Sequence, residues 1–210
     1  MANIEFKMTS VQDVAAAVPL MYSSGPYSFD YVFCHSEQHQ GTEYLRKAFI
    51  EQDIEFSHRH HLGLYLEGEL VALGCIKHAK QNAAFMKAAL KSFFNHFSFL
   101  QALGVLWRGM QTEAIIRPPQ QSAAVLCNLG VSETQRGLGL GTQLIHALEQ
   151  RALSLGYDVV ELDVAENNPK ARALYERLGY QQKYVKASKL KSQFGFVPTH
   201  TRMSKSISAP

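Results

Sequence analysis

The spacing of apolar and polar residues predicts two helices and a hairpin near the start of the chain. Residues 10–23 and 42–51 are predicted to be helical, and the second of these segments has apolar side chains at the spacing of one helical face. Residues 61–67 and 70–77 alternate between apolar and polar positions on either side of a Glu-Gly-Glu turn. This arrangement predicts a β-hairpin.

The stretch 83–110 differs from its surroundings because its apolar residues recur at helical spacing over almost its whole length. Phe85, Ala89 and Phe93 belong to this broad stripe, which is typical of an amphipathic helix. A break is expected near residues 95–98, after which the helical period continues. We expect the segment to pack on its own domain, because stripes of Phe and Leu at this spacing are usually core.

The following part of the chain predicts an alternation of strands and helices. Residues 122–131 and 159–164 are predicted strands, and each is followed by a helical pattern. Asn168 suits the N-cap of the second helix, with proline at its first position. The order strand, helix, strand, helix over 122–180 favours parallel strands joined by a right-handed crossover. The chain then returns to strands, with the last expected at 199–207.

Composition and length restrict the class of protein. The 210 residues are 46% hydrophobic and 19% charged, which is ordinary globular usage. Three cysteines at wide spacing suit a reducing compartment and exclude a disulfide framework. No apolar run approaches the roughly 20 residues that span a bilayer, and the first residues make a poor signal peptide. We therefore expect a single domain over residues 1–210, located in the cytoplasm and without a membrane span.

The net charge of +3 hides an uneven distribution along the chain. All 18 acidic residues lie at or before Glu176, and the seven charged residues after it are all basic, so the last part carries +7 and residues 1–176 carry −4. Such a bias can serve anion or nucleic-acid binding. Because these basic residues are scattered, we interpret them as a solvated face and expect no nucleic-acid partner.

The segment from Arg136 to Thr142 is a glycine-rich turn that precedes a helix. Glycine allows close approach of a ligand to the backbone, and the unpaired N–H groups of a helix start favour phosphate. A nucleotide P-loop is excluded because Thr142-Gln143 stands where Lys-Ser/Thr is needed. A dinucleotide fingerprint fits poorly, since Thr142 occupies the third glycine position. Asp158 lies at about the required 20 residues, which leaves that alternative open.

Two segments resemble the motifs of the GCN5-related N-acetyltransferase family. Residues 131–141, VSETQRGLGLG, are similar to the Gln/Arg-x-x-Gly-x-Gly/Ala loop of that family. Residues 168–180, NPKARALYERLGY, are similar to its Asn-x-x-Ala-x-x-Leu-Tyr-x-x-x-Gly-aromatic signature. The resemblance covers the core at 122–180. It implies an α/β (α+β) fold with a mixed, twisted sheet flanked by helices. The segment at about 83–110 would be a helical insertion between strands 3 and 4.

The resemblance also implies where a cofactor binds. In this family the loop amides bind the pyrophosphate of coenzyme A, the strand before the loop pairs with the pantetheine arm, and an asparagine contacts that arm. The loop residues implied here are Arg136, Gly137, Leu138, Gly139, Leu140, Gly141 and Thr142. The strand residues and the asparagine are Leu129, Gly130, Val131 and Asn168.

The implied reaction is acetyl transfer from acetyl-CoA to a primary amine, by direct attack in a ternary complex and without a metal. Tyr175 matches the family tyrosine that assists the departing thiolate, and a phenol suits this role because it can hydrogen-bond to or protonate that sulfur. Asp163 is the predicted general base. Carboxylates on other strands, a water chain, and the hairpin histidines His60, His61 and His78 are alternatives for the base. We expect Cys127 to be a strand-core thiol, with an acyl-cysteine route as the alternative.

The acceptor is expected to be a small-molecule or peptide amine. A non-catalytic acyl-CoA sensor is the alternative function. The insertion at 83–110 has alternatives to packing on its own domain: a wall of the acceptor site, a homodimer interface, or a membrane-surface contact suggested by Lys80, Lys87 and Lys91.

Overall fold

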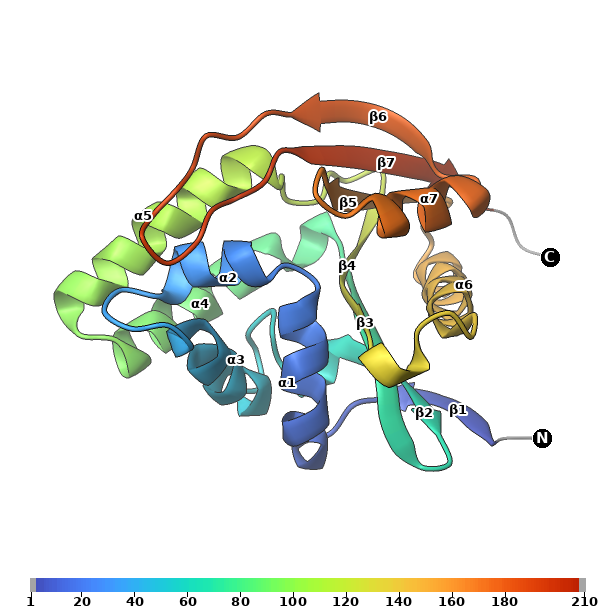
Figure 1. Ribbon diagram of the computed structural model, residues 1–210, viewed down its shortest axis with the longest axis horizontal. Coiled ribbons are helices and arrows are strands. Elements are labelled where there is room, and N and C mark those ends of the chain that lie inside the picture. The colour runs from blue at the N-terminus through green and yellow to red at the C-terminus, as the bar shows by residue number, and fades with distance from the viewer. Residues whose placement is uncertain (1–2, 208–210) are drawn as a thin grey trace.

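The computed structural model describes residues 3–207 and contains a seven-stranded mixed sheet with the order β1-β2-β3-β4-β5-β7-β6 (Figure 1). Neighbouring strands are antiparallel except for β4 and β5, which run parallel. The strands are β1 (Ile4–Met8), β2 (His61–Leu66), β3 (Glu69–Lys77), β4 (Ala124–Val131), β5 (Val159–Ala165), β6 (Gln181–Lys186) and β7 (His200–Ser206). The mixed, helix-flanked sheet confirms the predicted fold class.

Helices cover both faces of this sheet, as Figure 1 shows, with α6 and α7 on one side and α1 to α5 on the other. The helices are α1 (Val14–Ser23), α2 (Pro26–Phe33), α3 (Gln40–Ile50), α4 (Asn82–His96), α5 (Phe99–Ile115), α6 (Leu140–Ser154) and α7 (Pro169–Arg177). Short 3-10 turns lie at Val11–Asp13, His58–His60, Ala79–Gln81 and Glu133–Gln135. The apolar face of α6 packs on β2, β3 and β4 and forms the largest buried cluster.

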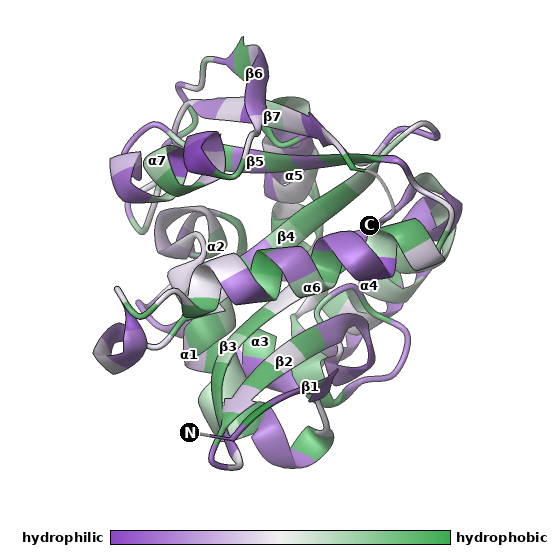
Figure 2. Cartoon of the chain, turned by 90° about the vertical axis from the view of Figure 1, so that its right-hand side faces the viewer, coloured by the Kyte–Doolittle hydropathy of each residue, from purple (hydrophilic) through white to green (hydrophobic). Residues whose placement is uncertain are grey.

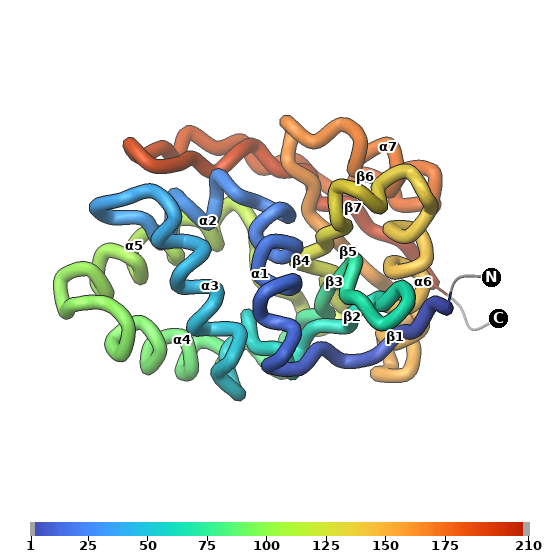
Figure 3. Tube along the Cα trace, turned by 60° about the horizontal axis from the view of Figure 1, so that its bottom comes forward, coloured from blue at the N-terminus to red at the C-terminus, as the bar shows by residue number. Residues whose placement is uncertain are grey.

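The predicted helical insertion is a hairpin of two helices, α4 and α5, between β3 and β4. The predicted break near residues 95–98 is confirmed, because α4 ends at His96 and α5 begins at Phe99 after a capping box at Ser98. One face of the hairpin enters a core cluster shared with α2 and α3. The hairpin forms the end of the molecule opposite to β1 and α6 (Figures 1 and 3).

Two elements have no counterpart in the sequence predictions. Strand β1 is a short edge strand whose first four residues are exposed, so it has no buried alternation to detect. Helix α2 has a signal at its start, since Gly25 is its N-cap and Pro26 occupies its first position. Its apolar residues Tyr31, Val32 and Phe33 are consecutive and all buried, which gives no helical period.

The contact of α1 with β4 depends on Gly130. A Cβ atom at this position would lie 2.1 Å from the carbonyl oxygen of Leu20 and 2.7 Å from its carbonyl carbon. Because both atoms are backbone, the helix itself has to move to admit a methyl group. The end of α1 therefore lies directly against the strand that precedes the glycine loop.

We expect Gly130→Ala to lower the free energy of unfolding by about 1–3 kcal/mol, the usual cost of overpacking. The measurement is chemical denaturation followed by circular dichroism. Gly109→Ala is the matched control, because nothing lies within 4 Å of its added Cβ and it stands within a helix. The control is expected to stabilise the protein by about 0.5–1 kcal/mol. Equal unfolding midpoints for the two variants would contradict the close contact.

Candidate functional site

Strands β4 and β5 pair over a short distance only and then separate (Figure 2). The pairs run from Ala124 with Val160 to Leu126 with Leu162. Beyond them, within the described residues, the edge of β4 that faces β5 has no strand partner. The other edge of β4 remains paired with β3 as far as Val131. The separation creates a gap in the middle of the sheet with free backbone groups along one side.

A bulge in β4 accompanies this separation. Asn128 has a φ of 53°, in the left-handed region, and the register with β3 shifts by one residue between Leu73 and Cys75. An extra residue on one strand locally bends it and increases its twist. Asparagine tolerates this conformation better than most residues. Sequence reasoning missed the bulge, and an asparagine within an otherwise apolar strand is the signal that indicates it.

Buried His61 holds the bulge in place. Its Nδ1 donates to the carbonyl oxygen of Ser57 at 2.8 Å, and its Nε2 accepts from the side-chain amide of Asn128 at 3.1 Å. This assignment requires a neutral ring, and burial lowers the pKa of His61 to about 4. Both ring nitrogens are therefore occupied. His61 is a positioning residue for the bulge, which removes it from the histidines considered as the general base.

The predicted cofactor loop joins the end of β4 to the start of α6. Gly137 and Gly139 have φ values of 82° and 79°, a region that favours glycine. Among the described residues, no acceptor is found for the backbone N–H groups from 137 to 142. Leu140 is buried under the loop and Leu138 is exposed. The loop thus presents a run of free donors at the positive end of the α6 dipole, a suitable site for a phosphate group.

The first turn of α6 lies close to α7. A Cβ atom on Gly141 would stand 3.5 Å from the side chain of Leu174 and 3.6 Å from that of Val131. Val131 and Leu129 are partly buried against the same apolar cluster. Asn168 caps α7, because its side chain accepts from the N–H of Ala171 at 3.2 Å. The structure therefore brings the first turn of α6 next to the end of β4 and to Leu174 of α7.

The Arg136 side chain turns back onto its own loop. Its Nε donates to the carbonyl oxygen of Val131 at 3.2 Å, and its guanidinium lies 3.4 Å from the carboxylate of Glu133. These contacts hold in place the residues that precede the glycine turn. The side chain is about half exposed, so its positive charge remains near the free amides.

Tyr175 lies on the buried face of α7, over the same side of the sheet as α6. It belongs to the apolar cluster that includes Leu126, Leu162 and Val164 of the two separating strands. No hydrogen bond joins its hydroxyl to another described residue, and the hydroxyl oxygen is not among the buried side-chain atoms that lack a partner. Burial raises the pKa of Tyr175 to about 12, so the hydroxyl stays protonated over the working range of pH.

Asp163 lies on the opposite face of β5, since side chains alternate along a strand. The Arg202 guanidinium holds it through Nε to one carboxylate oxygen and a second nitrogen to the other, each at 2.9 Å. Arg202 also donates to Glu161 at 3.0 Å and to the carbonyl oxygen of Arg117. Burial raises the pKa of Asp163 to about 6, while the positive charge of Arg202 opposes the shift. The carboxylate is thus ionised at neutral pH and fixed in orientation.

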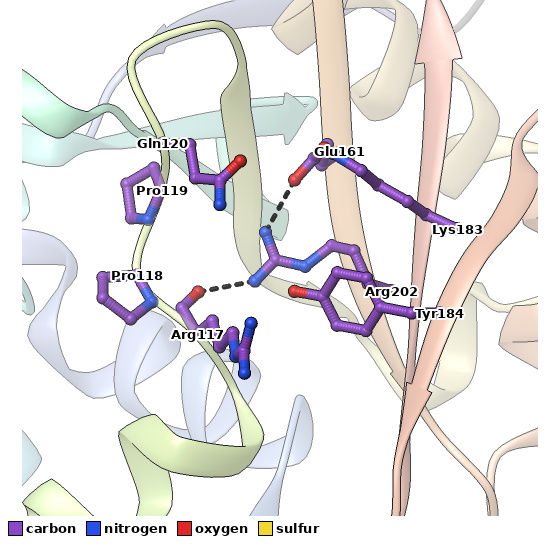
Figure 4. A pocket seen from close by; sticks show the side chains of 8 residues that line it. All are labelled: Arg117, Pro118, Pro119, Gln120, Glu161, Lys183, Tyr184 and Arg202. Carbon is purple, nitrogen blue, oxygen red and sulfur yellow. Dashed lines mark hydrogen bonds and ion pairs between the residues drawn. The ribbon is translucent and has the colours of Figure 1, made fainter.

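A pocket of about 440 Å³ lies beside this ion pair (Figure 4). Arg202 forms one of its walls and connects it to Asp163. The Arg117 guanidinium stacks 5.8 Å from the centre of the Tyr184 ring, and Lys183 neutralises Glu161 at 2.6 Å. The lining residues are Arg117, Pro118, Pro119, Gln120, Glu161, Lys183, Tyr184 and Arg202. Sequence reasoning did not single out Arg202 or the 117–120 loop.

Cys127 is half-buried rather than buried in the strand core, and it stands opposite buried Cys75 in the register of β3 and β4. No group of three or more His, Cys, Asp or Glu side chains that could hold a metal ion occurs among residues 3–207. Over the same residues, none of the helices has the length and apolar character needed to cross a bilayer.

Comparison with known proteins finds relatives among N-acetyltransferases. Two curated relatives match part of the chain. YycN, an uncharacterized N-acetyltransferase of Bacillus subtilis (strain 168), is 38% identical over 87 residues, which cover 41% of this chain and 53% of that protein. An L-2,4-diaminobutyric acid acetyltransferase of Shouchella clausii (strain KSM-K16) is 37% identical over 65 residues, 31% of this chain and 36% of that protein. The matched region therefore spans about half or less of each relative's length.

Solved structures extend the similarity of the fold to the whole chain. An N-acetyltransferase from Staphylococcus aureus Mu50 aligns over 96% of this chain and 100% of its own, with a TM-score of 0.68 and 13% sequence identity. The model of the Acetyltransferase (GNAT) family matches residues 28–180, well over half of the sequence. The protein thus belongs to the GNAT acetyltransferase family.

Proposed function

We propose that the protein is an N-acetyltransferase that moves an acetyl group from acetyl-CoA to the nitrogen of a primary amine. The observation that carries this proposal is the gap between β4 and β5, which has a loop of free backbone N–H groups at one end and different side chains on its two faces. In the reaction the amine nitrogen bonds to the acyl carbon, the thioester bond breaks, and one proton leaves the amine while the thiolate gains one.

The donor site would lie on the α6 and α7 side of the gap. The free N–H groups from 137 to 142 would hold the pyrophosphate, and the open edge of β4 at Leu129, Gly130 and Val131 would pair with the pantetheine amides. Asn168 keeps side-chain capacity beyond its capping bond, because an amide has two donors and a second acceptor lone pair. These groups position the thioester, which accounts for much of the acceleration in a two-substrate reaction.

The acceptor site would lie on the other face, where the pocket of Figure 4 leads to Arg202 and Asp163. A primary amine is mostly protonated at neutral pH, since its pKa is near 10. Asp163 would take the proton that the ammonium loses before the attack, and Arg202 would hold the carboxylate toward the amine. The second proton leaves the nitrogen as the thioester bond breaks and balances the one that the thiolate gains. The similarity to the diaminobutyric acid acetyltransferase supports an amine as the acceptor.

The test is calorimetric titration of the protein with acetyl-CoA and with NADH, followed by the same titrations of the Gly139→Glu variant. A glutamate there places a negative charge among the free amides and forces a side chain into a φ of 79°. We expect acetyl-CoA to bind and the variant to lose at least about thirtyfold in affinity, consistent with the loss of charge-assisted hydrogen bonds. NADH should bind more weakly than acetyl-CoA.

Gly156→Glu is the matched control, because Gly156 has a φ of 85° and open space around it, at the other end of α6. Both variants carry the same added charge and a similar backbone strain, so only a loss specific to Gly139→Glu places the donor in this loop. Tighter binding of NADH would refute the proposal in favour of a dinucleotide site. Binding of acetyl-CoA without turnover of any amine in a panel would instead indicate a non-catalytic acyl-CoA sensor.

A further inference from the structure

The α4–α5 hairpin leaves a large apolar surface uncovered. Eight bulky apolar side chains of the two helices are between 38% and 78% exposed. This hairpin patch consists of Met86, Leu90, Phe94, Phe99, Leu100, Leu103, Trp107 and Met110. Single exposed apolar residues are ordinary, but a gathered set of this size marks a binding surface.

The patch is continuous along both helices. Met86, Leu90 and Phe94 follow one another at intervals of four on α4, which places them in one row. The row on α5 starts at the turn, where the rings of Phe94 and Phe99 lie 5.8 Å apart. The residues of α5 continue at intervals of three and four, so they also share a face.

The patch is separate from the face of the hairpin that packs into the protein core. The hairpin already buries other side chains, among them Phe85 and Phe93 of α4 and Ala102 and Val105 of α5. Three of these, Phe93, Ala102 and Val105, belong to the cluster shared with α2 and α3. The hairpin therefore packs on its own domain with one face, as the sequence predicts, and presents a second apolar face outward.

The charges beside the α4 row of the patch are positive, and Glu113 near the end of α5 is the one carboxylate of the hairpin. The sequence contains no Asp or Glu between Glu69 and Glu113. Lys87 and Lys91 are exposed on α4, one turn apart, and each follows a patch residue directly in the chain. An apolar face with tryptophan and phenylalanine, flanked by lysines, is the composition of helices that lie in the interface of a bilayer. Anionic headgroups attract such lysines.

A second copy of the chain is a poorer occupant of the patch. In a twofold dimer the same surface packs against itself, and Glu113 near the end of α5 is the one carboxylate that the hairpin of the other protomer offers to Lys87 and Lys91. A bilayer supplies the missing negative charge. The hairpin also forms one end of the molecule, away from β1 and α6 (Figures 1 and 3).

We propose that the hairpin patch docks this protein on an anionic lipid bilayer, with the apolar rows in the interface and Lys87 and Lys91 beside the headgroup phosphates. The binding is peripheral and needs no membrane-spanning helix. It is independent of the donor and acceptor sites, which lie at the gap between β4 and β5.

Trp107 is the one tryptophan of the chain and belongs to the patch, so its fluorescence reports docking directly. With vesicles of phosphatidylcholine and phosphatidylglycerol in equal parts, we expect a blue shift of its emission and quenching by brominated acyl chains. Vesicles of phosphatidylcholine alone should bind at least tenfold more weakly. Lys87→Glu with Lys91→Glu should weaken binding by about thirtyfold or more, from the contribution of each lysine near the surface.

Phe99→Ser with Leu100→Ser removes the most exposed part of the patch and should abolish flotation with the vesicles. Leu155→Ser is the matched apolar control, since Leu155 is 46% exposed at the end of α6. Lys189→Glu with Lys191→Glu is the matched charge control. Both controls should bind as the native protein does, and thermal unfolding checks that every variant is folded.

Three outcomes would overturn the proposal. One is an unchanged Trp107 emission at saturating vesicles. The second is equal binding to neutral and anionic vesicles. The third is a blue shift of the Trp107 emission that increases with protein concentration in the absence of lipid. If sedimentation velocity then shows a dimer, and the Phe99→Ser, Leu100→Ser variant is monomeric, the patch is the interface with a second copy of the chain.

Discussion

Replacing Asp163 by asparagine is expected to lower kcat by about 10²- to 10⁴-fold, the usual contribution of a general base. Asparagine keeps the shape of the side chain and can still accept one hydrogen bond from Arg202. Arg202 also keeps its bonds to Glu161 and to the carbonyl oxygen of Arg117. The binding of acetyl-CoA should be unchanged, because the donor loop lies on the other face of the sheet.

The pH dependence gives a second readout for Asp163. Because burial raises its pKa to about 6, the carboxylate is protonated below that value and cannot take a proton. We expect kcat/KM of the native protein to fall as the pH drops below about 6, and the variant to lack this limb. The charged groups that bear on Asp163 are Arg202, Glu161 and Lys77. Of these, Arg202 and Lys77 stay positive throughout the range.

The contribution of Asp163 to the stability of the fold should fall as the pH rises, which is opposite to its contribution to activity. A carboxyl whose folded pKa is raised from 3.8 to about 6 binds its proton more tightly in the folded state. Its stabilising contribution is present below pH 3.8 and is lost as the pH rises through 6. Asp163→Asn removes this part of the pH dependence of unfolding.

Asp158→Asn is the control for these measurements, since Asp158 is exposed just before β5. An active Asp163→Asn variant with the native pH profile would exclude Asp163 as the base. Glu113 of α5, whose pKa is raised by desolvation, would then be the next carboxylate to test.

Replacing Tyr175 by phenylalanine is expected to lower kcat by about 10²-fold, comparable with the loss of one donor to a developing negative charge. A phenol with a pKa of about 12 does not readily give its proton to a thiolate with a pKa near 8.5. We therefore expect the hydroxyl to act by hydrogen-bonding to the departing sulfur. The affinity for acetyl-CoA should stay within about twofold, because this bond forms only as the thiolate develops.

The fold should not suffer from this substitution. The Tyr175 hydroxyl has no partner among the described residues, so its removal breaks no hydrogen bond. Tyr180→Phe is the contrasting control, since the Tyr180 hydroxyl donates to buried Glu149 at 2.9 Å. That variant should lose about 1–3 kcal/mol of stability and keep its kcat. Unchanged turnover in Tyr175→Phe would remove Tyr175 from the proposed chemistry.

Much of the local structure of the proposed donor site could be predicted from the sequence because its signals are local. The glycines at 137 and 139 adopt the positive φ values that the turn requires, and Asn168 caps α7 through its own side chain. The hairpin at 61–77 and the interrupted helical insertion also follow from periodicity within short segments. In each case the residues that determine the conformation lie within one or two turns of it.

The contacts of the proposed acceptor site could not be predicted in the same way. Asp163 and Arg202 are 39 positions apart and meet because β5 and β7 are neighbours in the sheet. Arg202 also donates to the carbonyl oxygen of Arg117, a residue that follows the helical insertion in the chain. Such contacts depend on strand order, and nothing in the local pattern of β7 specifies it.

The sequence by itself determined the family motifs, the strand and helix order from residue 122 onward, and the basic and apolar character of the insertion. Only the tertiary structure decided where β4 leaves β5, which face of the hairpin stays outside, and which carboxylate an arginine holds. The physical reason is the range of the interactions. Backbone conformation and amphipathicity are set within a few residues, while strand pairing, burial and ion pairs arise from segments that folding brings together.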